Sequence, residues 1–366
     1  MGKNTKSYAI VAGGTGGHII PSVVFGTWLE EKEGSRVEYY TGNRDLEKKI
    51  YDFFEKKPTF LPLSGSPRGT TGFSSLRRYM SMAYVTCRLF ARFFSKPPQA
   101  FFLFGGYLCV PFIVAAKILG IPAVIHEQNV LAGKTTRFAV RLGIPVCTGW
   151  PTCLFIEKEK KIFSGIPVRN LQHLHVLDAW NKLVPGIAFP SKEIILVFGG
   201  SLGSSLLVEL AFKLASSKDY ADCHFLILSK EEACEGKKEK NITFLEPQWD
   251  MSPLYTVASA VIARGGGSTL AELLAYNVPG LIIPFAKSSD GHQEKNAQCF
   301  KDLGGGDFWR ENEPFSELKK RLRHVLTVQR ELPQERKSNG TQDSLPSRRI
   351  FQAIMVKHMK GDVPGE

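Results

Sequence analysis

The sequence has few cysteines, and they form no recognisable motif. The seven cysteines are an odd number, and no two of them make a C-x-x-C pair. A disulfide framework uses an even set and a structural zinc site uses closely spaced pairs, so we expect neither. Free cysteines at scattered positions are typical of a reducing, cytoplasmic compartment.

Common metal and phosphate motifs are also absent. The eight histidines show neither H-x-x-x-H nor H-E-x-x-H spacing, so we expect no metal site. No lysine follows Gly17 or Gly203, which argues against a P-loop. Counted from Gly14, a G-x-G-x-x-G fingerprint would place Ile19 at its third glycine. A nicotinamide dehydrogenase therefore has little support.

No hydrophobic run has the form of a membrane span. Residues 97–116 carry no charge, but Gly105, Gly106 and Pro111 interrupt them. This pattern favours a buried strand, a turn and a helix. Residues 1–10 contain no apolar signal core.

Acidic residues are missing from one long stretch. Between Lys56 and His126 there is no Asp or Glu, in a chain whose net charge is +12. The basic residues of this stretch are Lys56, Lys57, Arg68, Arg77, Arg78, Arg88, Arg92, Lys96 and Lys117. Such a one-sided charge attracts an anionic partner, either nucleic acid or an anionic membrane surface. We expect no nucleic acid, because the arginines lack interleaved stacking aromatics and a recognised module.

Short apolar runs alternate with amphipathic stretches, which is typical of parallel sheets covered by helices. The pattern occurs twice with similar starts, IVAGGTGGH at 10–18 and LVFGGSLGS at 196–204. We predict an α/β protein of two Rossmann-like, doubly wound domains facing a cleft, residues 1–165 and 166–344. A last helix, near 345–362, is expected to pack back on one of them, with the N-terminal domain as the candidate.

The expected elements follow from this alternation, with a hinge near 164–170. Strands are predicted near 8–12, 36–41, 59–63, 100–104, 122–126, 145–148, 193–199, 223–228, 242–245, 259–263 and 280–283. Helices are predicted near 21–33, 44–56, 74–94, 107–119, 132–142, 203–217, 250–257, 267–276, 291–303 and 314–329.

Four glycine-rich loops follow predicted strands, at 13–17, 105–106, 199–203 and 265–267. A strand that ends in such a loop and leads into a helix directs backbone N–H groups and the helix dipole at an anion. One such loop also serves as an ordinary tight turn. Four of them predict a ligand cleft for a phosphate or diphosphate.

Polar side chains beside these loops are the candidate chemical groups. His18 suits a general base, although it also fits as an ordinary residue of a first helical turn. Glu272 suits a ribose diol, or the first turn of any helix. His292, Gln293 and Asn296 lie where a loop enters a helix and suit hydroxyl-rich ligands such as sugars.

Seven motifs occur in one order: GGTGGHIIP, FGGYLCVP, HEQN, SGIPVR, FGGSLG, RGGGSTLAE and PF…DGHQEKNA. Together they resemble the bacterial N-acetylglucosaminyltransferases that convert lipid I to lipid II in peptidoglycan synthesis. The resemblance implies the two-domain GT-B architecture and a reaction with inversion, without a cofactor or metal. The sugar would pass from UDP-N-acetylglucosamine to the C4 hydroxyl of the N-acetylmuramyl group of undecaprenyl-diphosphate-linked lipid I.

The same resemblance implies roles for individual residues. His18 is the implied base, with Glu127 as a second candidate that the sequence does not rank against it. Arg169 and the backbone near Gln248 would meet uracil, and Glu272 the ribose hydroxyls. Further implied substrate-binding residues are Thr15, Gly16, Gly17, Asn129, Ser201, Gly267, Ser268, Thr269, Leu270, Ala271 and Gln293.

The basic stretch contains the helix predicted near 74–94, within residues 73–96, that suits an anionic membrane. We expect its buried face to be formed by Leu76, Met80, Ala83, Cys87, Phe90 and Phe94. The residues assigned to the acceptor or membrane are Arg68, Phe73, Arg77, Arg78, Arg88 and Arg92. The predicted location is peripheral, on the cytoplasmic side of the inner membrane; a solvated basic helix is the alternative.

Other functions stay open at this point. A related transferase could use UDP-sugar and diacylglycerol, or the chain could be a UDP-N-acetylglucosamine epimerase. A basic nucleic-acid-binding protein and a non-catalytic homologue are further alternatives. The intact His18, Glu272 and Gln293 argue against the last of these.

Overall fold

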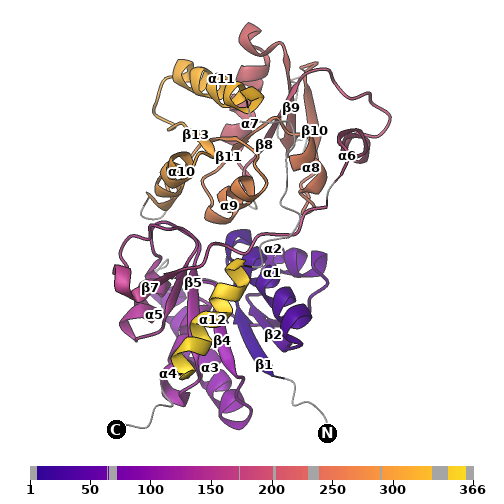
Figure 1. The fold of residues 1–366 in the computed structure, drawn as a ribbon. Coiled ribbons are helices and arrows are strands. Elements are labelled where there is room, and N and C mark those ends of the chain that lie inside the picture. Colours follow the sequence, from indigo (N-terminus) through magenta and orange to yellow (C-terminus); the bar gives the residue numbers. More distant parts are fainter. Residues whose placement is uncertain are drawn as a thin grey trace. The chain divides into compact units, whose positions relative to one another are not determined.

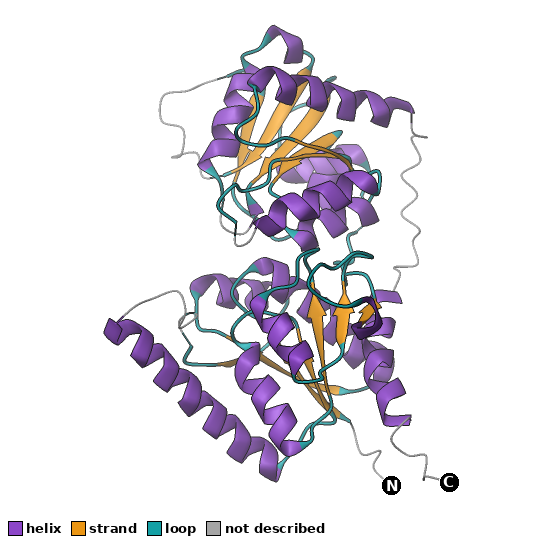
Figure 2. Ribbon diagram, turned by 90° about the vertical axis from the view of Figure 1, so that its left-hand side faces the viewer, coloured by secondary structure: helices purple, strands orange, loops and turns teal. Residues whose placement is uncertain are grey.

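The chain divides into two compact units in a computed structural model, which describes residues 6–63, 65, 72–172, 174–200, 203–229, 239–288, 291–331 and 345–359. Unit 1 comprises Met1–Arg169 with Asp343–Glu366, and unit 2 comprises Asn170–Gln342 (Figure 1). Each unit contains one parallel sheet with helices on both of its faces (Figure 2). The predicted α/β class with two doubly wound sheets is confirmed.

Unit 1 contains seven parallel strands in the order β3-β2-β1-β4-β5-β6-β7. They are β1 Ser7–Val11, β2 Arg36–Thr41, β3 Thr59–Phe60, β4 Ala100–Leu103, β5 Ala123–Glu127, β6 Val146–Thr148 and β7 Lys161–Phe163. Their helices are α1 Gly16–Glu33, α2 Asp45–Phe53, α3 Gly72–Ser95, α4 Cys109–Leu119, α5 Lys134–Arg141 and α12 Leu345–Met359. The short strand β7 was not expected from the sequence.

Unit 2 contains six parallel strands in the order β10-β9-β8-β11-β12-β13. They are β8 Glu193–Phe198, β9 Cys223–Leu228, β10 Ile242–Leu245, β11 Ala260–Ala263, β12 Gly280–Ile282 and β13 Gly306–Phe308. The helices are α6 Val176–Leu183, α7 Ser205–Ala215, α8 Ser252–Val257, α9 Gly267–Ala275, α10 His292–Asp302 and α11 Phe315–Glu331. The sequence did not predict β13.

The strand order explains where the glycine loops lie. In unit 1 the chain runs from β1 outward through β2 and β3, and then returns to place β4 on the other side of β1. In unit 2 it does the same between β8 and β11. Ligands of such sheets bind beyond the carboxyl ends of the strands at this switch point. Loops 13–17 and 105–106 follow β1 and β4, and loops 199–203 and 265–267 follow β8 and β11.

The C-terminal helix α12 packs on the sheet of unit 1 and contacts β5. The ring of Phe351 lies 6.0 Å from that of Tyr8, 5.9 Å from that of Trp28 and 6.5 Å from that of Phe102. This aromatic cluster buries apolar surface of the first and last parts of the chain together.

The buried face of α3 differs from the predicted one. Val85, Leu89 and Phe93 are buried, and the Phe93 ring packs 5.0 Å from that of Phe101. The predicted face is wrong: Leu76, Met80 and Phe94 are 55%, 65% and 74% exposed, Ala83 and Cys87 are exposed, and Phe90 is half-buried. Both stripes are apolar at helical spacing, so periodicity alone does not decide which one meets the sheet.

This assignment of faces can be tested by stability. Leu89→Ala removes a buried side chain and is expected to lower the unfolding free energy by about 2–5 kcal/mol. Leu76→Ala, the matched control on the exposed face, should change it by less than about 0.5 kcal/mol. Urea unfolding followed by circular dichroism measures both values. A larger loss of unfolding free energy for Leu76→Ala than for Leu89→Ala would show that the face predicted from the sequence is the buried one.

Candidate active site

The first glycine loop of unit 1 follows β1 and leads directly into α1. A Cβ on Gly13 would lie 2.9 Å from Glu47 Oε1, and Gly14 has a φ of +94°. The helix begins at Gly16, not near residue 21 as predicted, with Thr15 as its N-cap. Thr15 makes no side-chain cap, and the first turn has no acidic residue. The positive end of the helix dipole is therefore available to an anionic ligand.

Glu47 holds this loop and is not among the residues predicted from the sequence. The side chain is fully buried. Its Oε1 accepts the N–H of Gly14 at 2.7 Å, and its Oε2 accepts that of Arg44 at 2.8 Å. Glu47 is the third residue of α2, and its bond back to Arg44 is part of a capping box. That local pattern was the available signal.

His18 lies in the first turn of α1 and is half-buried. Its Nδ1 lies 2.8 Å from Gln128 Oε1. A Cβ on Gly105 would lie 3.1 Å from His18 Cε1, so the glycine in the loop after β4 leaves room for the ring. The side chain is thus positioned from β1, β4 and β5, at the switch point of the sheet.

Glu127, the second candidate base, is occupied by four hydrogen bonds. Its Oε1 accepts the backbone N–H of Asn129 at 3.0 Å and the Asn129 side-chain amide at 3.1 Å. Its Oε2 accepts the N–H of Gly133 at 2.9 Å and the Thr136 hydroxyl at 2.5 Å. The carboxylate is buried and holds the turn into α5. This geometry suits positioning of Asn129 and favours His18 as the base.

In unit 2 the loop after β11 leads into α9 in the same way. Gly266 is the N-cap, and the first turn, Gly267 to Thr269, contains no acidic residue and receives no side-chain cap. Leu270 is buried, so only its backbone is placed for a ligand. Ala271 is half-buried. The start of α9 has the features of an anion site.

Glu272 is 4% exposed on α9, and its Oε2 accepts the hydroxyl of Tyr255 on α8 at 3.2 Å. A buried carboxylate that accepts hydrogen bonds is suited to a diol, whose two hydroxyls are donors. Tyr255 was not singled out from the sequence. It orients the carboxylate from the neighbouring helix.

The amide of Gln293 has a fixed orientation. Its Oε1 accepts the N–H of Gly265 at 3.2 Å and the N–H of Phe285 at 2.9 Å. Both partners are donors, so the oxygen faces the loops and the NH₂ group faces away from them. Asn296, fully buried, donates to the carbonyl of Gly265 at 2.9 Å. Two residues of α10 therefore hold the loop after β11.

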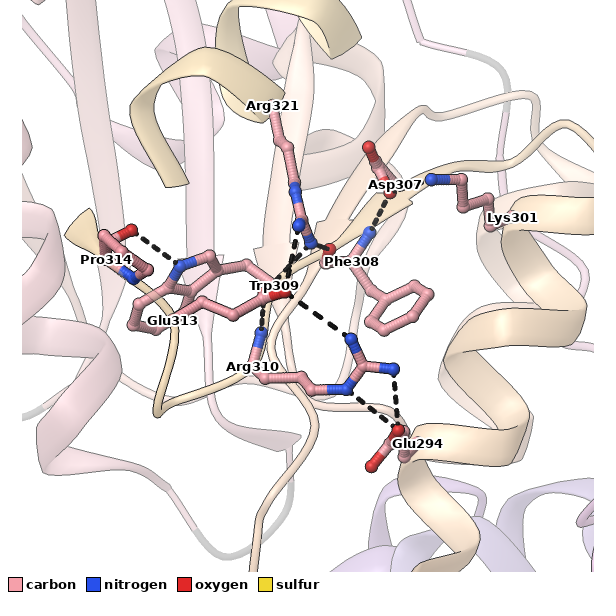
Figure 3. Close-up of polar contacts among 9 residues, drawn as sticks. All are labelled: Glu294, Lys301, Asp307, Phe308, Trp309, Arg310, Glu313, Pro314 and Arg321. Carbon is pink, nitrogen blue, oxygen red and sulfur yellow. Dashed lines mark hydrogen bonds and ion pairs between the residues drawn. The ribbon is translucent and has the colours of Figure 1, made fainter. Parts of the chain in front are cut away.

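Ion pairs hold the start of α10 in place (Figure 3). Arg310 donates to Glu294 Oε1 at 2.9 Å. Arg321, on α11, forms a two-pronged pair with Glu313, with both N···O distances 3.0 Å. Glu313 also accepts the Arg310 N–H at 2.8 Å. Because Gln293 precedes Glu294, this network positions the side chain that faces the loops.

Glu313 gives the network a pH dependence. Partial burial opposes ionisation, but the Arg310 N–H and the Arg321 guanidinium outweigh it and lower the pKa of the carboxyl below its ordinary value of 4.5. Such a carboxyl contributes stability that is present above its unfolded pKa and lost as pH falls through the folded one.

Glu313→Gln should therefore lower the unfolding free energy by about 1 kcal/mol at neutral pH. The difference from the unmodified protein should shrink as pH falls below 4.5. Urea unfolding of both proteins at several pH values measures this. A difference that stays constant from neutral pH to about pH 3 would show that the charge of Glu313 contributes nothing.

The remaining predicted substrate residues are spread over both units. Arg169 is buried and is the last residue of the first segment of unit 1. Gln248 follows β10 and is half-buried. Ser201 and Arg68 lie outside the described residues. His18 therefore lies at the switch point of unit 1 and the start of α9 at that of unit 2, whereas Gln248 follows the edge strand β10.

The charged residues of α3 are not equivalent. Arg92 pairs with Glu38 on β2 at 2.7 Å, so it attaches the helix to the sheet. Arg77 and Arg88 are exposed, and Arg78 is half-buried. Exposed aromatic and apolar side chains lie on the same helix: Phe73, Leu76, Tyr79, Met80, Tyr84 and Phe94.

The described residues contain no group of three or more His, Cys, Asp or Glu side chains arranged to hold a metal ion. Among the same residues, no helix combines the length and hydropathy needed to cross a membrane.

Both units match models of one enzyme family. Residues 8–143 match the glycosyltransferase family 28 N-terminal domain, and residues 194–348 match the glycosyltransferase family 28 C-terminal domain. The chain belongs to glycosyltransferase family 28. The match places the four glycine loops, His18, Glu272 and Gln293 within the family's two domains.

Two curated relatives that match most of the chain carry the same name. The chain is 32% identical to the UDP-N-acetylglucosamine–N-acetylmuramyl-(pentapeptide) pyrophosphoryl-undecaprenol N-acetylglucosamine transferase of Thermosipho africanus, over 83% of this chain and 87% of the relative. It is 27% identical to the Prochlorococcus marinus (strain NATL2A) protein of the same name, over 94% of this chain and 97% of the relative.

Solved structures share the fold. The crystal structure of Acinetobacter baumannii MurG superimposes with a TM-score of 0.65 at 22% identity, covering 93% of this chain and 99% of that one. The glycosyltransferase of kitacinnamycin gives a TM-score of 0.67 at 16% identity, covering 97% and 99%. At these identities the likeness concerns the fold alone.

Proposed function

We propose that the protein transfers N-acetylglucosamine from UDP-N-acetylglucosamine to the muramyl C4 hydroxyl of undecaprenyl-diphosphate-linked lipid I, which gives lipid II. The observation that carries the proposal is the match of both units to family 28, together with relatives of that activity over most of the chain. The polar groups at the switch points support it.

The donor would be held by unit 2. The start of α9 offers backbone N–H groups to the diphosphate, and Glu272 accepts hydrogen bonds from the ribose hydroxyls. The NH₂ group of Gln293 donates to hydroxyls of the sugar, because its oxygen is already bound to Gly265 and Phe285. Backbone amides would also stabilise the charge that develops on the departing UDP.

The acceptor would be activated by His18 of unit 1. The imidazole Nε2 takes the proton of the C4 hydroxyl while that oxygen forms a bond to the anomeric carbon of the donor sugar. The bond between this carbon and the diphosphate oxygen breaks, and UDP leaves with the electron pair. Attack from the opposite face inverts the anomeric centre. The proton on His18 is then released to solvent.

We further propose that α3 attaches the protein to the cytoplasmic surface of an anionic membrane, where a polyprenyl substrate resides. Exposed apolar side chains beside arginines suit the interface between headgroups and acyl chains. Basic residues near such a surface each contribute about 1 kcal/mol, so the attachment is reversible.

Membrane binding can be measured by sedimentation with liposomes. The double variant Arg77→Gln/Arg88→Gln should bind roughly 30-fold more weakly to liposomes containing acidic lipid, because two surface charges are lost. The charge-matched control Lys213→Gln/Lys320→Gln changes exposed residues of unit 2 and should bind as the unmodified protein does. An equal loss of liposome binding in both double variants would show that only the net charge of the protein, and not α3, attracts it to the membrane.

The function itself is tested by the choice of substrates. Purified protein is incubated with labelled UDP-N-acetylglucosamine and a lipid I analogue, and in parallel with UDP-glucose or with diacylglycerol. We expect transfer only with the first pair. Transfer to diacylglycerol would indicate a different UDP-sugar transferase, and formation of UDP-N-acetylmannosamine without an acceptor would indicate an epimerase.

A further inference from the structure

A chain of hydrogen bonds connects His18 to a buried histidine. His18 Nδ1 lies 2.8 Å from Gln128 Oε1, and Gln128 Nε2 lies 3.0 Å from His126 Nδ1. His126 Nε2 lies 2.9 Å from the carbonyl oxygen of Gly165. All four residues belong to unit 1. The polar side chains therefore form a continuous series from the candidate base into the core.

Two backbone carbonyls determine which atom donates in each hydrogen bond between His18 and Gly165. The Gly165 carbonyl only accepts, so His126 Nε2 carries a proton and, in a neutral ring, Nδ1 accepts. Gln128 Nε2 lies 3.1 Å from the carbonyl oxygen of His126, so this atom is the donating nitrogen of the amide. Gln128 Oε1 consequently faces His18 and must accept from it.

His126, the buried end of this series of hydrogen bonds, keeps its protonation state. His126 is 1% exposed, and burial lowers its pKa to about 4. At neutral pH its ring is uncharged, and Nδ1 remains an acceptor for the Gln128 amide. The Gln128 amide therefore keeps its orientation, and its oxygen stays directed at His18.

We propose that Gln128 and His126 are positioning residues, which hold neutral His18 with its proton on Nδ1 and its Nε2 unprotonated. Among the described residues, His18 Nε2 has no hydrogen-bond partner. The catalytic effect of this arrangement rests on the proposed function, in which Nε2 is the atom that takes the proton of the acceptor hydroxyl. When it does so, Gln128 Oε1 continues to accept from Nδ1, so the imidazolium keeps its orientation.

The charged side chains described near His18 form hydrogen bonds with other groups and not with its ring. Glu47 and Arg44 bind the backbone of Gly14, which lies in the loop before α1. Glu127 is committed to Asn129, Gly133 and Thr136. In the described part of the chain, Gln128 is the side chain that hydrogen-bonds the His18 ring.

The tautomer can be observed directly in the full-length protein. Long-range ¹H–¹⁵N correlation spectra of ¹⁵N-histidine-labelled protein distinguish a protonated from an unprotonated ring nitrogen, and His18→Gln assigns the signal. At about pH 9, where an ordinary imidazole is neutral, we expect proton on Nδ1 and none on Nε2. A His18 signal with its proton on Nε2 overturns the proposal.

Gln128→Met removes the amide while it keeps the length of the side chain. We expect the His18 proton to move to Nε2 in a large fraction of molecules, and kcat to fall about tenfold with the donor KM unchanged, because one hydrogen bond selects the tautomer. The matched control is Trp150→Phe, which removes a bond to the backbone carbonyl of Gln128. Its His18 signal should be unchanged. An unchanged tautomer in Gln128→Met overturns the proposal.

The two proposals can fail separately. If His18 is protonated on Nδ1 but no sugar is transferred to lipid I, the positioning role stands and the proposed function is wrong. If sugar is transferred while His18 carries its proton on Nε2, the function stands and the positioning role is wrong. The measurement on the unmodified protein decides the second point even if Gln128→Met does not fold.

Discussion

Replacing His18 with alanine is expected to lower kcat about 10²–10⁴-fold, which is the usual contribution of a general base. The side chain lies in the first turn of α1 and contacts Gln128, so its removal leaves unchanged the residues of unit 2 that we propose to hold the donor. The dissociation constant for UDP should therefore stay within about twofold of the original. Steady-state kinetics and calorimetric titration with UDP measure the two quantities.

Glu127→Gln is the informative comparison for this prediction. The carboxylate accepts four hydrogen bonds, two of them from the backbone, so an amide there disturbs the turn into α5. We expect a lower melting temperature together with any loss of activity, whereas His18→Ala should keep the original melting temperature. An unchanged kcat in His18→Ala would remove this residue from the mechanism.

Glu272→Gln is expected to weaken binding of UDP-N-acetylglucosamine about 10- to 100-fold, because a hydrogen bond to a charged acceptor is among the stronger ones. Tyr255→Phe is the matched control: it removes the 3.2 Å contact to Glu272 Oε2 and leaves the carboxylate in place. Its effect should be below about threefold.

A ligand without ribose hydroxyls identifies the group that Glu272 contacts. The unmodified protein should bind 2′,3′-dideoxyuridine diphosphate more weakly than UDP, by about the factor that Glu272→Gln causes. Glu272→Gln should bind the two nucleotides equally, since the interacting pair is then already lost. Equal discrimination in both proteins would show that the carboxylate does not meet the ribose.

Sequence patterns predicted the sheets because the longer strands are apolar runs that end in glycine loops. The strand Ala100–Leu103 is buried throughout and precedes Gly105, as the pattern requires. The strands Lys161–Phe163 and Gly306–Phe308 have three residues each and contain charged or glycine residues, so they give no such signal. Pairing with their neighbours creates them.

The face of α3 was not predictable because it carries two apolar stripes. Val85, Leu89 and Phe93 meet the sheet, whereas Leu76 and Met80 lie on another side at equally regular spacing. Packing against the side chains of the sheet determines which apolar stripe is buried. The start of α1 at Gly16 is a similar case: Pro21 has the form of a first helical residue, but the helix has already begun.

The candidate site could be predicted as a set of residues but not as a set of contacts. Alternation in an extended segment places His126 and Gln128 on one side and Glu127 on the other, with Gln128 directly after β5. That rule, applied to HEQN, separates the residues near His18 from the one that holds the turn into α5. Hydrogen-bond directions, and the burial of the groups involved, depend on the tertiary structure and not on local sequence.

N-acetylglucosamine should pass to lipid I in excess EDTA if backbone amides, in place of a metal, hold the departing diphosphate. Mass spectrometry and NMR of the product measure this transfer. We expect one added N-acetylhexosamine per lipid I analogue, joined to the muramyl C4 oxygen in the β configuration. No added sugar, an α linkage, or transfer only after a divalent cation is restored would show that the proposed reaction is wrong.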